Sequence, residues 1–134
     1  NERLEDQVSM TEVLLGKNPF GPHPFAETLL AEDECVPVGF ALFFHNFSTF
    51  LAMPGIYLED LFVVPQHRGR GIGRALLKHL AQTAVERGCG RLEWSVLDWN
   101  RDAIGFYERL GAKPNSEWTV YRLTGEALTA LGRE

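Results

Sequence analysis

The most constraining feature of this sequence is a stretch in which a strand pattern, a glycine-rich loop and a helix pattern follow one another directly. Residues 56–64 are β-branched, aromatic or leucine except for Glu59 and Asp60, and Pro65 ends the run. The loop RGRGIG at 68–73 leads into a helix that ends before Gly88. The apolar residues of one broad helical face are Ile72, Leu76, Leu77, Leu80, Ala84 and Val85.

A glycine-rich loop at the start of a helix is suited to binding an anion. Glycine lets several backbone N–H groups converge on one ligand, and the positive end of the helix dipole favours negative charge there. The stretch therefore predicts a cradle for a phosphorylated ligand. A plain tight turn before a helix is the alternative that the loop alone leaves open.

Length and charge narrow the classes of protein. With 134 residues, we expect a single domain spanning 1–134. The net charge of −5 argues against a nucleic-acid partner and favours a cationic one. No stretch approaches the roughly 20 apolar residues of a membrane span, and no signal-peptide pattern is present. We therefore expect a cytoplasmic protein without a membrane partner.

Cysteines and histidines show no metal-binding pattern. Cys35 and Cys89 are far apart and outside any C-x-x-C pair, so two buried free thiols are expected rather than a disulfide. The four histidines have neither H-x-x-x-H nor H-E-x-x-H spacing. No metal site is predicted.

The remaining elements follow from periodicity and capping residues. The S-x-x-E pattern at Ser9–Glu12 predicts a short helix through Leu15, and residues 16–24 form a loop rich in glycine and proline. Strands are expected at residues 25–31, 36–45, 91–97 and 118–123. Asn100 is placed to cap a helix over 101–110, and Thr124 a short terminal helix. The order predicts a mixed α/β sheet.

The segment 46–54 is predicted to be a loop of unusual apolar content, including Phe47, Phe50, Leu51 and Met53. Two interpretations stay open. The loop packs under a neighbouring element, or it serves as a lid or a dimer contact.

Spacing separates the possible phosphate-binding motifs. The chain has no Lys-Ser or Lys-Thr after Gly73, which the Walker pattern requires, and Gly69, Gly71 and Gly73 run G-x-G-x-G rather than G-x-G-x-x-G. What raises the specificity is the combination of Arg68-x-x-Gly71-x-Gly73 with a downstream motif, Asn100-x-x-Ala103-x-x-Phe106-Tyr107-x-x-Leu110-Gly111. Together the two motifs resemble those of the GNAT superfamily of N-acetyltransferases.

The resemblance is closer to one branch, which comprises the spermidine/spermine diamine acetyltransferases and their thialysine-acetylating relatives. It is carried by EDQV at 5–8, HPF at 23–25, YLEDLFV at 57–63, RGRGIG at 68–73 and DWN at 98–100. It implies an α/β GNAT fold, a mixed and mostly antiparallel sheet flanked by helices. It also implies that the first strand and most of the first helix of the family are absent from this chain, and that the protein is a homodimer.

The resemblance further implies acetyl-CoA as the acetyl donor. The backbone of residues 61–63 would pair with the pantetheine arm and the loop N–H groups would hold the pyrophosphate. A role on the protein surface is nearly as good an interpretation for Arg70. The donor-binding residues implied are Leu61, Phe62, Val63, Arg68, Gly69, Arg70, Gly71, Ile72, Gly73, Arg74, Asn100 and Tyr107.

Two residues are expected to be catalytic. Tyr107 matches the family tyrosine that protonates the departing thiolate, and a phenol is suited to this because it remains protonated at neutral pH. Glu59 matches the glutamate that takes the amine proton, and an acid in an apolar strand is otherwise costly. An aromatic core position is the alternative for Tyr107, and a structural ion pair for Glu59.

The acceptor site should be acidic if the substrate is a cationic amine. Glu2, Glu59 and Asp60 are the residues that the resemblance implies for it, although Asn1 stands where relatives have an aromatic residue. In an ideal strand Glu59 and Asp60 point to opposite faces, so they share one role only if a bulge intervenes. The expected function is acetyl transfer to a polyamine or a thialysine-like amine. A peptide amine acetyltransferase and a silent acyl-CoA-binding module are the alternatives.

Overall fold

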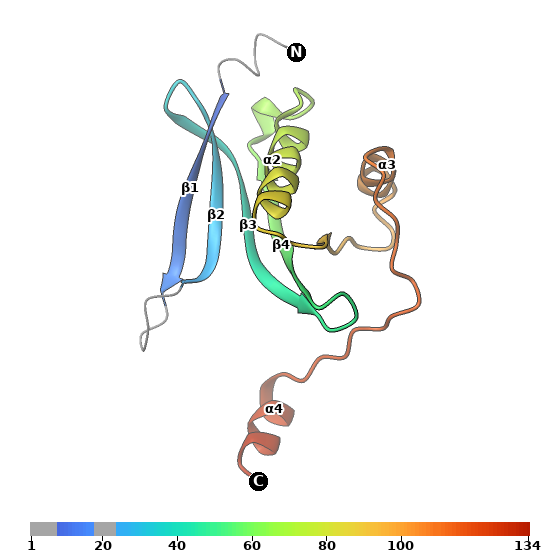
Figure 1. The fold of residues 1–134 in the computed structure, drawn as a ribbon. Coiled ribbons are helices and arrows are strands. Elements are labelled where there is room, and N and C mark those ends of the chain that lie inside the picture. The colour runs from blue at the N-terminus through green and yellow to red at the C-terminus, as the bar shows by residue number, and fades with distance from the viewer. Residues whose placement is uncertain (1–7, 18–23) are drawn as a thin grey trace. The chain divides into compact units, whose positions relative to one another are not determined.

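The computed structural model describes residues 8–17 and 24–134, which belong to two compact units, Asn1–Ser95 and Val96–Glu134. Glu2 and residues 18–23 of the expected loop lie outside the described residues. The elements are β1 (Val8–Lys17), β2 (Pro24–Asp33), β3 (Val36–Ser48), β4 (Met53–Val63), the 3₁₀ turn η1 (Pro65–His67), α2 (Ile72–Glu86), β5 (Leu92–Trp94), α3 (Arg101–Arg109) and α4 (Gly125–Gly132) (Figure 1).

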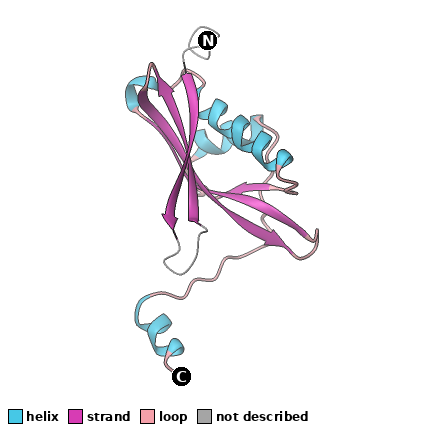
Figure 2. Ribbon diagram, turned by 60° about the vertical axis from the view of Figure 1, so that its left-hand side comes forward, coloured by secondary structure: helices cyan, strands magenta, loops and turns pink. Residues whose placement is uncertain are grey.

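The first unit is built on one five-stranded sheet in the order β1-β2-β3-β4-β5. Successive strands from β1 to β4 pair antiparallel, and β5 pairs parallel to β4 after the chain has crossed over through α2. Figure 2 shows the strands as a twisted sheet with α2 along one face. The expected fold class, a mixed and mostly antiparallel sheet with flanking helices, is confirmed.

The hydrophobic core of this unit lies between α2 and the sheet. The helix buries six side chains, and the strands contribute Leu29, Ala31, Val38, Ala41, Phe43, Ile56 and Leu58. The predicted helical face is right except at its C-terminal end. Val85 is 78% exposed and Thr83 is buried in its place, with its hydroxyl donating to the His79 carbonyl (2.9 Å). The 3.6-residue period places position 83, rather than 85, on the side of Leu76 and Leu80.

The helix predicted at Ser9–Leu15 is wrong, because these residues lie in β1. The backbone pairs with β2 from Val8 opposite Asp33 to Lys17 opposite Pro24, and the Thr11 hydroxyl donates to Glu32 (2.7 Å). A capping box is a local signal worth about 1 kcal/mol. A ladder along the whole of an available strand edge outweighs it.

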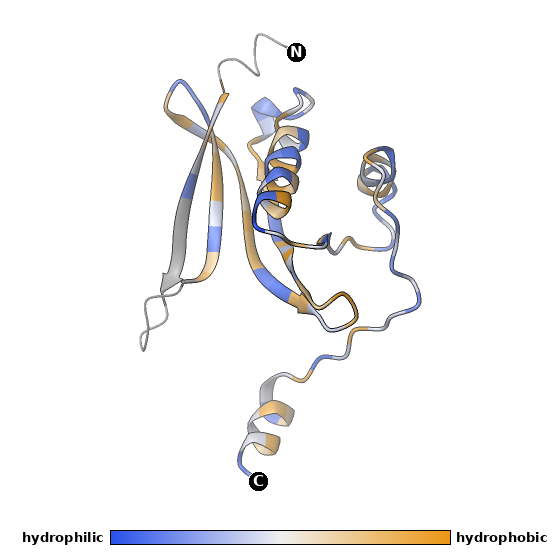
Figure 3. Cartoon of the chain, in the orientation of Figure 1, coloured by the Kyte–Doolittle hydropathy of each residue, from blue (hydrophilic) through white to orange (hydrophobic). Residues whose placement is uncertain are grey.

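Two other strand boundaries differ from prediction. The predicted loop 46–54 is a hairpin in which β3 continues to Ser48 and β4 begins at Met53. Its turn is coloured hydrophobic in Figure 3, and Phe50 there is 88% exposed. Leu51 and Met53 instead approach Gly90, where an added Cβ would lie 3.1 and 3.2 Å from their side-chain atoms. The strand predicted at 91–97 is shortened to Leu92–Trp94.

The strand predicted at 118–123 is also wrong, since no ladder includes these residues. Residues 96–134 are all described and contain α3 and α4 but no second strand with which the segment could pair. Val120 and Tyr121 are accordingly exposed. The terminal helix begins after Thr124 as predicted, although the Thr124 side chain makes no capping hydrogen bond.

Two further predictions from the sequence concern the cysteines and membrane-spanning helices. Both cysteines are free as predicted, but neither is fully buried. Cys35 is exposed because it lies in the turn between β2 and β3, and Cys89 is partly exposed. In the described part of the chain, no helix combines the length and the apolar character needed to cross a bilayer.

A charged clamp ties the end of α2 to the sheet. Arg87 donates from both terminal nitrogens to Glu27 (2.8 and 2.9 Å), and its guanidinium lies 5.9 Å from the centre of the Phe43 ring. The hydrogen bond to Glu27 raises the pKa of Arg87 above its ordinary value, against the opposing effect of burial. A raised pKa means that the arginine's contribution to stability is fully present at neutral pH and is lost only when the pH rises beyond the ordinary pKa of arginine.

We predict that Arg87→Met lowers the free energy of unfolding by about 1–2 kcal/mol. Exposed ion pairs contribute about 0.2–1 kcal/mol and loss of one partner of a buried pair costs about 3–5 kcal/mol, and this pair is partly buried. Urea unfolding at neutral pH measures the change. Lys78→Met is the matched control, because Lys78 is exposed on the same helix and no carboxylate in the described residues pairs with it. Equal effects of the two substitutions would contradict the clamp.

Candidate active site

A β-bulge in β4 sets the geometry of the acidic residues. Leu42 of β3 is opposite Asp60, but the next residue, Phe43, is opposite Leu58, so Glu59 is the extra residue. Both acidic side chains are exposed. From the sequence, Glu59 and Asp60 were expected to share one role only if a bulge intervened, and the bulge is present.

The bulge also shifts which residues of β4 face α2. Leu58 and Leu61 are paired with the buried residues Phe43 and Ala41, so both lie on the α2 face although they are three positions apart, an odd spacing that an ideal strand would place on opposite faces. Asp60 is paired with Leu42 on the opposite face, where the ring of Tyr57 contacts Phe44 (5.3 Å between centroids). Asp60 therefore lies on the face of the sheet away from α2.

Beyond the bulge, β4 has an open edge. Among the described residues, β5 pairs only with residues 56–58, so the following residues of β4 have no partner strand on that side. Val64 donates to Val38 of β3 (2.8 Å), which means that the backbone groups of Val63 and, two residues earlier, Leu61 point to the open side. The resemblance implied ligand pairing for residues 61–63, and of these Phe62 directs its backbone groups toward β3 instead.

Arg68 does not extend freely into solvent. Its Nε donates to the Val63 carbonyl (2.8 Å), and its guanidinium lies over the Phe62 ring, 5.4 Å from the centroid. The arginine therefore occupies one acceptor of the open edge and holds the loop against β4. Its remaining N–H groups keep its positive charge beside the glycine loop.

The glycine loop adopts backbone conformations that side chains disfavour. Gly69 and Gly71 have φ of 77° and 83°, and Gly71 is the N-cap of α2. The N-cap provides no side chain, and the first turn contains no acidic residue. The N–H groups of Ile72, Gly73 and Arg74 lie in the first helical turn, where no helical carbonyl four residues earlier can accept from them. They are therefore available as donors to an external anion.

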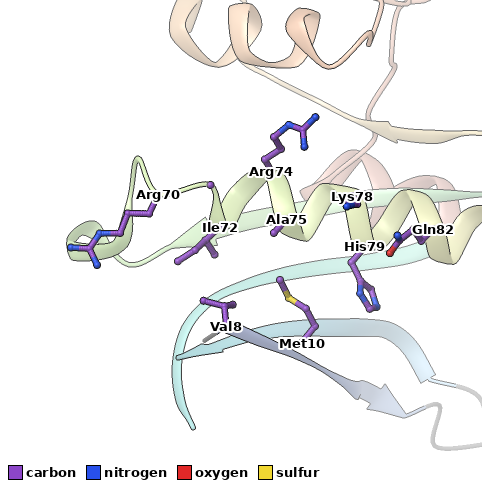
Figure 4. A pocket seen from close by; sticks show the side chains of 10 residues that line it. Val8, Met10, Arg70, Ile72, Arg74, Ala75, Lys78, His79 and Gln82 are labelled. Carbon is purple, nitrogen blue, oxygen red and sulfur yellow. The ribbon is translucent and has the colours of Figure 1, made fainter. Parts of the chain in front are cut away.

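A cavity of about 270 Å³ lies along α2 from its N-terminus to Gln82, beside β1. Figure 4 shows Val8 and Met10 of β1 facing Ile72 and Ala75, whereas Arg74 points away from β1. The wall of the cavity next to β1 is therefore mainly apolar, whereas Arg70 and Arg74 place positive charge at the N-terminal end of α2. No carboxylate in the described part of the chain pairs with Arg70 or Arg74.

The second unit carries the predicted Asn100 and Tyr107 on α3. The Asn100 side chain caps the helix by accepting from the Ala103 N–H (3.2 Å), as predicted. Tyr107 is half-buried beside Phe106, with ring centroids 5.5 Å apart. Burial raises the pKa of the Tyr107 phenol above its ordinary value of 10.0, which keeps it protonated at neutral pH.

A polar cluster that was not predicted from the sequence lies at the junction of β3, β4 and β5. Glu93 accepts from the Asn46 amide (3.1 Å) and lies 2.9 Å from the Nε of Arg91, while the hydroxyls of Tyr57 and Ser95 share a hydrogen bond (2.5 Å). A signal was present, because Arg91, Glu93 and Ser95 alternate within the strand predicted at 91–97 and therefore share a face.

A family model described as the acetyltransferase (GNAT) family matches residues 4–112. The chain is 48% identical over 101 residues to L-ornithine N5-acetyltransferase NATA1 of Arabidopsis thaliana, a match that covers 75% of the chain and 44% of that protein. It spans less than half the length of this relative. It is 39% identical to the thialysine N-epsilon-acetyltransferase of Bos taurus, with 97% and 82% of the two chains covered.

A solved structure shares the fold. An integron cassette protein from V. cholerae superposes with a TM-score of 0.84 at 26% identity, covering 96% of this chain and 99% of the other. The family match and the ornithine and thialysine relatives confirm the resemblance to this family and branch that the sequence indicated. The chain belongs to the acetyltransferase (GNAT) family.

Proposed function

We propose that this protein transfers the acetyl group of acetyl-CoA to a primary amine of a small cationic substrate. The observation that carries the proposal is the combination, within the first unit, of the open edge of β4, the glycine loop at the start of α2, and the two acids at the bulge. In a member of this family, the open edge and the glycine loop would form the binding site for acetyl-CoA, and the two acids would form a negatively charged site for the acceptor amine.

The residues present fit the donor. Leu61 offers both backbone groups and Val63 its N–H along the open edge, which suits an amide-containing arm. The free N–H groups at the start of α2 and the positive charge of Arg70 and Arg74 suit its phosphates. Bound acetyl-CoA would supply an activated acyl group as a thioester.

The reaction needs one proton acceptor and one proton donor. The neutral amine attacks the thioester carbon, the C–N bond forms and the C–S bond breaks, and the thiolate leaves. We assign Glu59 to remove the amine proton, directly or through water, and Tyr107 to protonate the sulfur. Asp60, on the face away from α2, adds negative charge that attracts a cationic amine.

The relatives' names leave the acceptor open. Ornithine and thialysine are amino acids with a side-chain amine, whereas a human relative at 31% identity is named for spermidine and spermine. We include a peptide amine and a non-catalytic acyl-CoA-binding role as the alternatives that the assay must exclude. We also propose a cytoplasmic homodimer, for which sedimentation of the purified protein is the test of the oligomeric state.

An assay of thiol release tests the function. The protein is mixed with acetyl-CoA and, separately, ornithine, thialysine, lysine, polyamines and peptide amines. We expect turnover with at least one small diamine or diamino acid. Coenzyme A binding without turnover on any amine would overturn the enzymatic proposal in favour of the silent module.

We predict that Tyr107→Phe lowers kcat by about 10²–10⁴-fold, the usual contribution of a positioned acid. Acetyl-CoA affinity, measured by calorimetry, should change little. Because the pKa of Tyr107 is raised, loss of wild-type activity through its ionisation should occur only above pH 10.0. Tyr121→Phe is the matched control, since that tyrosine is 93% exposed in the same unit. An unaltered kcat in Tyr107→Phe would remove this residue from the mechanism.

The glycine loop provides a second prediction. Gly71→Ala should cost roughly 1–2 kcal/mol in unfolding free energy, because alanine disfavours the left-handed region. It should also weaken acetyl-CoA binding. Gly73→Ala should instead stabilise the fold by up to about 0.5–1 kcal/mol, since its Cβ would meet only Val63 at 4.0 Å. Denaturant unfolding and calorimetry measure both, and equal destabilisation by the two substitutions would contradict the backbone explanation.

A further inference from the structure

The polar cluster beside the bulge contains two charged residues, Arg91 and Glu93, that have no role in the proposed acetyl transfer. Glu93 and Arg91 are each about one-third exposed, so both are accessible to a small ligand. Glu93 accepts the Asn46 amide at Oε1, and the Arg91 Nη2 donates to the Phe47 carbonyl (3.5 Å). Among the described residues, Oε2 of Glu93 and Nη1 of Arg91 make no hydrogen bond, so both can bind a ligand.

The cluster is not optimised for stability. The Arg91 Nε lies 2.9 Å from Glu93 but is buried without an aligned hydrogen bond among the described residues, and the Asn46 Oδ1 is buried without a donor. A buried polar group without a partner costs about 1–3 kcal/mol. Such exceptions call for an explanation, and a binding role is one that this arrangement supports.

The cluster shares a face of the sheet with Asp60. In the β4–β5 register Glu93 is opposite Tyr57, and Tyr57 is opposite Phe44 on the face away from α2. Asn46, two residues after Phe44 in β3, contacts Glu93 from that same face. A ligand bound at Glu93 could therefore extend along β4 toward the bulge without crossing the sheet.

The spacing matches a diamino acid. Glu93 is level with Tyr57, two residues from Glu59, which corresponds to roughly 7 Å along a strand. The side-chain amine and the carboxyl carbon of ornithine are separated by five bonds of about 1.5 Å, an extended length of roughly 6–7 Å. An amine placed at the bulge would thus leave its amino-acid head group at the cluster.

Resting on the proposed acetyl transfer, we infer that Arg91 and Glu93 bind the α-carboxylate and the α-ammonium group of a diamino acid whose side-chain amine is acetylated at the bulge. Arginine forms strong charge-assisted bonds with carboxylates, and the free oxygen of Glu93 accepts from an ammonium. The pair of opposite charges matches a zwitterion. A simple diamine or polyamine, which has no carboxylate, would leave Arg91 without its ligand partner and bind less tightly.

Ornithine and putrescine test this inference, because putrescine is ornithine without the carboxylate. The wild-type protein should have at least about tenfold higher kcat/KM for ornithine. In Arg91→Met that ratio should fall about tenfold or more, through KM rather than kcat. Arg91→Lys should restore part of the ratio, since it keeps the charge but not the planar fork. Glu93→Gln should raise the KM for ornithine as well.

The control is Arg87→Met, which removes an arginine from another Arg–Glu pair, on the α2 face, and should leave the ratio as in the wild type. Thermal unfolding of each variant identifies losses that are due only to stability. A wild-type protein that uses putrescine as well as ornithine, or an Arg91→Met variant that affects the two equally, would overturn the inference while leaving acetyl transfer intact. If no amine is acetylated, calorimetric measurement of ornithine and putrescine binding still tests the inference. Ornithine binding that is no tighter than putrescine binding would overturn it.

Discussion

The pairing of β4 with β5 ends at Leu58, and the candidate site depends on that ending. Up to this residue the two strands share a ladder, and one residue later the bulge at Glu59 changes the alternation of β4. The backbone groups of Leu61 and Val63 are consequently directed to an edge without a partner strand in the described part of the chain. An unpaired edge is normally a liability, so its position next to a glycine loop is consistent with a ligand that completes the ladder.

The bulge also joins two kinds of chemistry that an ideal strand would separate. On the α2 side, Leu58 and Leu61 both contribute to the layer under the helix. On the other side, Asp60 shares a face with Tyr57 and, through it, with the cluster around Glu93. One inserted residue therefore keeps the core continuous while it brings acids beside the open edge.

Arginine–glutamate pairs on the two faces of the sheet differ in what they satisfy. Arg87 and Glu27 form a fork with both nitrogens and both oxygens engaged, which suits a structural clamp. Arg91 and Glu93 lie within ion-pair distance, but the Arg91 Nε is buried without a hydrogen-bond partner among the described residues. Geometry of this kind, rather than the presence of a pair, separates a stabilising contact from a binding one.

The sequence alone determined the features that depend on neighbours along the chain. The glycine loop needs Gly69 and Gly71 because their own φ angles are positive, α2 follows from its own periodicity, and Asn100 caps the helix that begins beside it. The family resemblance followed from these local motifs and was confirmed. Tertiary structure decided what depends on distant partners. It made β1 a strand despite its capping box, left residues 118–123 without a ladder, placed the bulge at Glu59 and brought Arg91 and Glu93 to Asn46. Strand pairing joins residues far apart in sequence, and no local pattern specifies which edge is available.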